Sequence, residues 1–206
     1  MPITTYTELK SAVADWLLRD DLTAVLPSFI SLAEAGLNRQ ARHWRMEKRS
    51  SATLDSQYSA LPADFLQPIR LSLTSGTTFE LELASQADIV DMRSLAANNT
   101  GRPRYYALTA GEIEVFPTPG GDYTLEMAYV ARPPALSDSN ADNWLLTYYP
   151  DAYLYGTLLQ AAPYLKDDER VGLWKSMYDG AVAGIIADGE RAKFGGSGLR
   201  VKIRSY

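Results

Sequence analysis

The chain has 206 residues, of which 46% are hydrophobic and 22% are charged, with a formal net charge of −5. This length supports one large core or two small modules, and no apolar run approaches the roughly 20 residues that span a bilayer. The absence of cysteine excludes disulfides and thiolate metal sites, and a single histidine, His43, excludes zinc sites that need several imidazoles. We therefore expect a globular protein with no metal site, no cofactor site and no catalytic residues.

The charge is uneven along the chain. Residues 191–206 contain five basic residues and no acid, whereas residues 1–190 carry all 25 acids and 15 bases, a formal charge of −10. An acidic body with a basic tail indicates that the tail binds an acidic surface, for example on a neighbouring copy. The same distribution argues against general nucleic-acid binding, which needs basic residues on the body itself.

Two helices are predicted near the N-terminus. Thr5 and Glu8 have the spacing of a capping box, and a helical apolar stripe follows to about residue 19. The second helix is predicted over residues 27–44, with Pro27 as its first residue. Its apolar positions recur at steps of three and four: Leu26, Ile30, Ala33, Leu37, Ala41 and Trp44.

The polar side of the second helix is the first candidate site. Glu34, Asn38 and Arg42 follow one another at steps of four, so they share a helical face. This stripe is either a solvated surface or a contact with a neighbouring subunit. His43 stands at the predicted helix end, where an imidazole more often contacts free carbonyls than a substrate.

The middle of the chain has the period-two pattern of strands. Residues 69–73 and 79–83 flank Ser75-Gly76 and predict a β-hairpin. Ser85 is expected to cap a short helix to about residue 95. Residues 105–109, 112–116 and 122–131 predict three further strands in an antiparallel sheet with one exposed acidic face. Its glutamates are Glu80, Glu82, Glu112, Glu114 and Glu126.

The C-terminal third is predicted to be helical again. An apolar helix starts at Pro150 and is kinked or ended by Pro163, and a last helix runs to about residue 194. Three glycines that follow are interpreted as a hinge, because a phosphate-binding loop would need a Lys-Ser/Thr pair. The hinge glycines are Gly195, Gly196 and Gly198.

The last residues alternate between apolar and basic side chains, which predicts a docking arm that adds to a partner's sheet or groove. The alternative is an unstructured basic tail. The arm comprises Leu199, Arg200, Val201, Lys202, Ile203, Arg204 and Tyr206.

The order of several segments resembles a known family. The resemblance rests on three groups of segments, taken in chain order. The first group is residues 16–22 and 27–39. The second is residues 61–65, before the predicted hairpin, and residues 101–105, and the third is residues 149–156 and 161–170. Taken in this succession, the chain is similar to the head-to-tail adaptor proteins of tailed bacteriophages. That family includes the tail accessory and tail tubular proteins of short-tailed phages.

The resemblance implies an α+β fold. A helical bundle would comprise residues 1–45 and 143–196, a β module with one short helix would be inserted at residues 46–142, and residues 197–206 would form the arm. It also implies a ring, typically of twelve copies, below the portal vertex. The bundle and arm would face the portal and sister subunits, and the β module would face the tail.

The resemblance further implies a structural role without enzymatic activity. The ring would extend the DNA channel, help to retain the packaged genome and offer a platform for the nozzle or tail tube. The protein would lie at the head–tail junction of the virion, and in the host cytoplasm during assembly, with no membrane contact. Genomic DNA would pass without specific binding. The acidic sheet face found in the sequence would suit such a channel, and our hypothesis is that its charge repels the DNA phosphates.

Two alternatives remain open at this stage. One is a connector or stopper protein in the neck of a long-tailed phage, since fold alone does not fix function. The other is a cell-wall-degrading virion enzyme with paired carboxylates, which would need two acids at a defined separation in a cleft.

Overall fold

The computed structural model describes residues 2–165 and 170–194, which form an α+β fold of helices and mainly antiparallel sheets. This confirms the α+β class of the predicted fold. The chain divides into two compact units. Residues 1–46 and 133–206 belong to the first, and Glu47–Arg132 form the second. We call them the helical unit and the β unit.

The helical unit contains most of the helices, including one that was not predicted, α4. The bounds are α1 (Tyr6–Leu17), α2 (Leu26–Gln40), α4 (Trp144–Tyr148), α5 (Pro150–Leu165) and α6 (Val171–Phe194), with a 3-10 turn at Trp44–Met46. The predicted capping box of α1 is present, since the Thr5 and Glu8 side chains each bond the other's backbone N–H. Pro163 lies inside the last turn of α5.

The second predicted helix is shorter than expected. It ends at Gln40, because Ala41 adopts an extended conformation with ψ of 137°. The break leaves Ala41 buried, but Trp44 is 41% exposed in the 3-10 turn. The apolar period therefore predicts the buried face correctly up to Ala41, whereas the aromatic residue beyond it lies on the surface.

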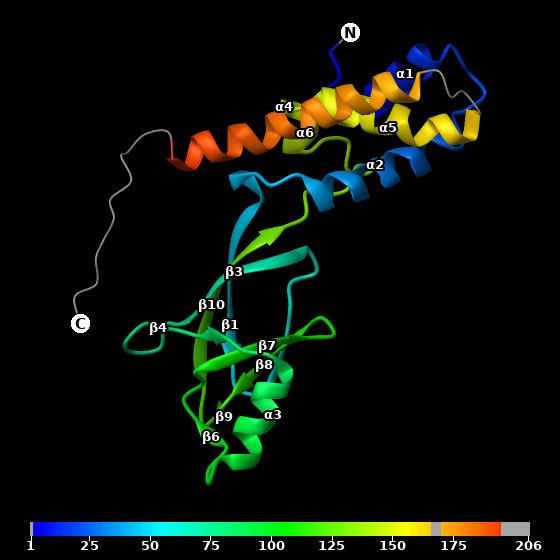
Figure 1. The fold of residues 1–206 in the computed structure, drawn as a ribbon. Coiled ribbons are helices and arrows are strands. Elements are labelled where there is room, and N and C mark those ends of the chain that lie inside the picture. The colour runs from blue at the N-terminus through cyan, green and yellow to red at the C-terminus, as the bar shows by residue number, and fades with distance from the viewer. Residues whose placement is uncertain (1, 166–169, 195–206) are drawn as a thin grey trace. The chain divides into compact units, whose positions relative to one another are not determined.

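The helices share one hydrophobic core. In Figure 1, α5 lies between α2 and α6, and both helices contact it. Leu9 of α1, Ile30 of α2 and Ile185 of α6 are almost completely buried in this core. Residues 133–142, which the sequence analysis places in the β module, also pack here, since the Leu136 side chain belongs to the same core.

The β unit consists of two four-stranded sheets and one short parallel pair. The first sheet has the order β1-β10-β3-β4, the second has the order β2-β8-β7-β5, and β6 pairs with β9. The bounds are β1 (Glu47–Leu54), β2 (Tyr58–Ala60), β3 (Phe65–Leu73), β4 (Phe79–Glu80), β5 (Glu82–Leu83), β6 (Thr100–Gly101), β7 (Tyr105–Thr109), β8 (Glu112–Phe116), β9 (Thr118–Pro119) and β10 (Tyr123–Ala131).

The predicted hairpin around Ser75-Gly76 forms only in part. Its second strand pairs with β3 through two residues of β4, and the chain then passes to the other sheet, where β5 runs parallel to β7. Leu81 lies at the crossing and is buried between the sheets. Burial of this leucine therefore divides a segment that the alternation predicts as one strand.

The core of the β unit lies between the two sheets. Leu71 of β3, Ile113 of β8 and Leu125 of β10 are among its most buried members. Helix α3 (Gln86–Leu95) covers the other face of the second sheet, against β7 and β8, as Figure 1 shows. The unit therefore stacks sheet, sheet and helix in that order.

The turn between β7 and β8 offers a test of the backbone geometry. Ala110 and Gly111 both have positive φ, 46° and 88°, as a two-residue hairpin turn requires. We predict that Ala110→Asn raises the free energy of unfolding by about 1 kcal/mol, because asparagine tolerates this conformation better than alanine. Urea denaturation measures the change. The control Ala97→Asn, at an exposed residue without positive φ, should change stability by less than about 0.5 kcal/mol.

Candidate interaction surfaces

The predicted hinge and docking arm lie outside the described residues. Within residues 2–165 and 170–194, no group of three or more acidic or imidazole side chains is arranged to hold a metal ion. The helices of the same residues include none that is long and apolar enough to cross a membrane. The remaining candidates are therefore surfaces, and their predicted residues can be located one by one.

Glu34 does not project to solvent. One oxygen of its carboxylate accepts a hydrogen bond from the Leu136 N–H at 2.8 Å and another from the Tyr153 hydroxyl at 3.2 Å. Asn143 donates to the same hydroxyl at 2.8 Å and to the Pro134 carbonyl oxygen at 2.8 Å. We call Glu34, Tyr153 and Asn143 the polar network; it fastens residues 134–143 to α2 and α5.

The polar network changes the pKa of its members. Burial raises the pKa of Glu34, although the hydrogen bonds from Leu136 and Tyr153 oppose this effect. Burial also raises the pKa of Tyr153, and the nearby Glu34 carboxylate adds to the shift. The tyrosine therefore remains a hydrogen-bond donor throughout the physiological range.

Arg42 also differs from its predicted place. The helix has ended two residues earlier, and the guanidinium donates to the carbonyl oxygens of Ala41 at 2.7 Å and Asn38 at 3.1 Å. Basic side chains commonly satisfy the free carbonyls of a helix end in this way. Glu34, Asn38 and Arg42 therefore do not form one exposed stripe, because Glu34 turns inward and Arg42 folds back.

The five glutamates of the predicted acidic face are divided between two sheets. Glu126 of β10, in the first sheet, lies between Arg49 at 2.7 Å and Arg70 at 3.7 Å. The arginines come from the neighbouring strands β1 and β3, so this part of the surface is charge-compensated. Glu80, Glu82 and Glu112 are exposed, which leaves three acids on the surface.

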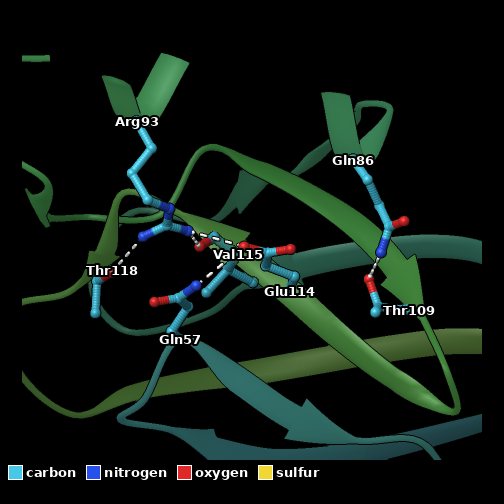
Figure 2. Close-up of polar contacts among 7 residues, drawn as sticks. All are labelled: Gln57, Gln86, Arg93, Thr109, Glu114, Val115 and Thr118. Carbon is cyan, nitrogen blue, oxygen red and sulfur yellow. Dashed lines mark hydrogen bonds and ion pairs between the residues drawn. The ribbon is translucent and has the colours of Figure 1, made fainter. Parts of the chain in front are cut away.

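Glu114 is buried beneath α3. Figure 2 shows Arg93 of α3 reaching across the second sheet to the Glu114 carboxylate, the Val115 carbonyl oxygen and Thr118. The Arg93–Glu114 distance is 3.1 Å, and the Glu114 side chain is only 9% exposed. Gln57 donates to the same carboxylate oxygen at 3.0 Å. This ion pair fastens α3 to its sheet, and Gln86 adds a hydrogen bond to Thr109 near the start of the helix.

His43 is a packed residue of the helical unit. Its ring stacks on Trp144 with a centroid distance of 5.2 Å, and its Nδ1 accepts a hydrogen bond from the Arg45 N–H. Burial lowers the pKa of His43, and the positive Arg45 adds to the effect. His43 therefore packs among aromatic rings and accepts a backbone N–H, whereas Arg42 donates to the free carbonyls for which the sequence suggested the imidazole.

An exposed cation–π stack beside His43 was missed by the sequence analysis. The Arg45 guanidinium lies 4.8 Å from the ring centre of Trp44 and 4.3 Å from that of Tyr148. Both rings remain on the surface, with 41% and 56% of each residue exposed. Trp, Tyr and Arg are the residue types most enriched in binding hot spots. The sequence gives no signal for the stack, because Tyr148 lies over 100 positions from the adjacent Trp44 and Arg45.

One comparison with known proteins identifies a relationship. The family model described as "SU10 adaptor protein" matches residues 4–202. No curated protein matches the chain.

The polar network predicts an unusual pH dependence. Folding raises the pKa of Glu34 above 4.5. The folded state is therefore stabilised most at low pH, where the Glu34 carboxyl is protonated. This stabilisation is lost as the pH rises from 4.5 through the raised pKa. Glu34→Gln keeps an acceptor oxygen without the charge, so its stability relative to wild type should rise over that window. Thermal unfolding between pH 4 and pH 8 measures this.

Two further variants control the experiment. Glu34→Ala should destabilise the chain by about 1–3 kcal/mol, because the Leu136 N–H and the Tyr153 hydroxyl would lose the acceptor to which both donate. Glu112→Gln changes an exposed glutamate of the β unit and should leave the pH profile unaltered. A Glu34→Gln profile parallel to that of wild type would contradict the role given to the network.

The ion pair under α3 gives a second prediction. Arg93→Met should destabilise the chain by about 2 kcal/mol, because Glu114 would keep a buried charge without its guanidinium. Glu114→Gln should cost less, since Gln57 still has an acceptor. The double variant should lose less free energy of unfolding than the two single variants lose in total. We expect a difference of about 1 kcal/mol or more in a double-mutant cycle. Strictly additive effects would show that the two side chains are not coupled.

Proposed function

The chain belongs to the SU10 adaptor protein family, and on this premise we propose that it forms a ring below the portal at the head-to-tail junction of a bacteriophage virion. The ring, of twelve copies by family resemblance, extends the DNA channel and offers an attachment platform to the next tail protein. The same arrangement helps to retain the packaged genome until ejection. The chain has a structural role, consistent with a family of structural adaptors.

The observation that carries this proposal is the family match over residues 4–202, which includes both compact units. The earlier resemblance rested on the succession of separate segments along the same span. A match to one unit alone would support only a shared module. Coverage of both supports a shared role for the whole chain.

Each unit has features suited to a scaffold. The helical unit has its own core, an internal polar network and the exposed Trp44–Arg45–Tyr148 stack. The β unit has a separate core and a helix held by the Arg93–Glu114 pair. We propose that the helical unit is the terminal helix bundle that faces the portal and sister subunits, and that the β unit faces the tail.

The charge distribution supports a channel that DNA can pass. The exposed glutamates Glu80, Glu82 and Glu112 repel phosphate groups, whereas Glu114 and Glu126 are neutralised by arginines. We propose that only the three exposed acids act on DNA. The basic arm, residues 199–206, supplies the opposite charge for binding to protein partners.

Assembly on the portal tests the proposal. Purified chain is mixed with cognate portal rings, and the product is examined by native mass spectrometry and electron microscopy. We predict a stoichiometric ring with the full chain and at least a tenfold loss of occupancy when the chain is truncated after Gly195. The physical reason is that truncation removes three basic and three apolar side chains of the arm.

A full-length control separates charge from length. In this variant Leu199, Val201 and Ile203 become serine, so the arm keeps its length and bases but loses its apolar side. Weakened assembly of this variant would assign part of the binding to hydrophobic contacts. A full chain that stays monomeric beside an intact cognate portal would overturn the adaptor proposal.

A further inference from the structure

A hollow on the exposed side of α1 is lined by both apolar and acidic side chains. It measures about 310 Å³ and lies along the N-terminal segment and the first helix of the helical unit. Ile3, Ala12 and Trp16 supply apolar surface, and Glu8 and Asp15 supply carboxylates. Ser11 lies between the two acids on the same helical side. We call this hollow the α1 groove.

The α1 groove is lined by two acids, of which Glu8 already accepts three hydrogen bonds from Thr4 and Thr5 at the helix start. The described residues that line it include no lysine or arginine. The nearest base along α1, Lys10, points elsewhere, with its ammonium 2.8 Å from Asp138 and over the Tyr6 ring. Hydrogen bonds from the Thr4 side chain and from the backbone lower the pKa of Glu8, so this acid remains ionised. The groove is therefore negatively charged, and Asp15 is its acid outside the capping box.

The apolar part of the groove is incompletely covered. Trp16 makes an edge-to-face contact with Tyr155 at a centroid distance of 5.8 Å, yet 46% of the residue is exposed. Ile3 and Ala12 pack against the helical core from the other side. An occupant that covers Trp16 would bury aromatic surface, at roughly 25 cal/mol for each Å² of apolar area.

We propose that the α1 groove binds the C-terminal arm, residues 199–206, of a second copy of this chain. The arm combines three bases with three aliphatic side chains in alternation, which complements a groove with carboxylates beside an apolar surface. Long basic side chains can lay their stems on apolar surface while their charged ends reach nearby acids. The identification rests on this complementarity.

The dimensions agree with a short strand-like occupant. From Glu8 to Trp16 the helix rises about 12 Å, at 1.5 Å per residue. An extended peptide covers that distance with about four residues, at roughly 3.3 Å each. The alternating part of the arm, residues 199–204, is long enough to follow the whole groove.

A contact between two copies is the kind that the proposed ring needs. Arm and groove are different surfaces of one chain, so their contact between copies is head-to-tail, and repeated contacts of this kind form a ring where the rotation between copies closes and an open filament where it does not. The inference therefore deepens the proposed function by naming the receiving site on the sister subunit. It is distinct from portal binding, and the two can fail separately.

Cross-linking tests the contact, because the chain has no cysteine of its own. One full-length variant carries Ser11→Cys in the groove, and another carries Ser205→Cys in the arm. The two are mixed, alone at high concentration and with cognate portal rings, and treated with a short bis-maleimide. We expect a cross-linked heterodimer. A control pair with Ser94→Cys on α3 in place of Ser11→Cys should give at least tenfold less product.

A charge variant tests the chemistry of the same contact. Asp15→Lys, on the exposed side of α1, should reduce cross-linking of the Cys pair about five- to tenfold and make the remaining cross-linking less sensitive to salt. The matched control Asp91→Lys makes the same charge change on an exposed helix of the β unit and should have no effect.

The outcomes separate the two proposals. Absence of heterodimer in both samples overturns the α1 groove proposal, and a full-length chain that nevertheless assembles on portals leaves the adaptor function standing. A chain carrying both cysteines that cross-links only within itself overturns the assignment to a second copy. Heterodimer without any portal binding supports the groove and counts against the proposed function.

Discussion

The helical unit depends on the Glu34 carboxylate, which binds the chain where it re-enters this unit after the inserted β unit. The chain leaves the helices after Met46 and re-enters them at Pro133, so the core is built from two distant parts of the sequence. Glu34 holds the returning segment through the Leu136 N–H, and Tyr153 and Asn143 extend the same bonds into α5 and the Pro134 carbonyl. The Leu136 side chain is buried in the same core, so the hydrogen bond and the apolar contacts hold one residue together.

Insertion of the β unit costs little chain entropy, because the two ends of this unit lie close together. Glu47 of β1 pairs with Val130 of β10, so the two ends of the inserted unit lie on neighbouring strands. Paired residues of antiparallel strands have their Cα atoms roughly 5 Å apart. Joining the helical segments through a folded unit whose ends are this close requires little loop closure. The separate cores of the two units are consistent with this arrangement.

The sequence predicts most helices and strands because their signals are local. The Thr5 and Ser85 caps, the aliphatic period of α2 and the alternation of β8 depend on residues within one or two turns. The predictions fail where distant contacts decide. Leu81 is buried in the core where the chain passes between the sheets, and α2 ends at Gln40 although the apolar period continues to Trp44. The candidate surfaces were harder still, since Glu34 and Glu114 owe their burial to residues over 20 positions away.

The contrast between buried and exposed charge explains why an acidic face could not be inferred from alternation. A period of two tells that Glu112 and Glu114 share a side of β8, but not that α3 covers one of them and leaves the other in solvent. The exposure of apolar residues could not be inferred from local pattern either. Leu18 ends α1 with a positive φ of 53° and is 87% exposed, although glycine would fit that conformation without strain. The positive φ costs free energy in the folded chain, and the exposed Leu18 side chain recovers none of it by burial, so local backbone geometry and apolar character do not predict where this residue lies.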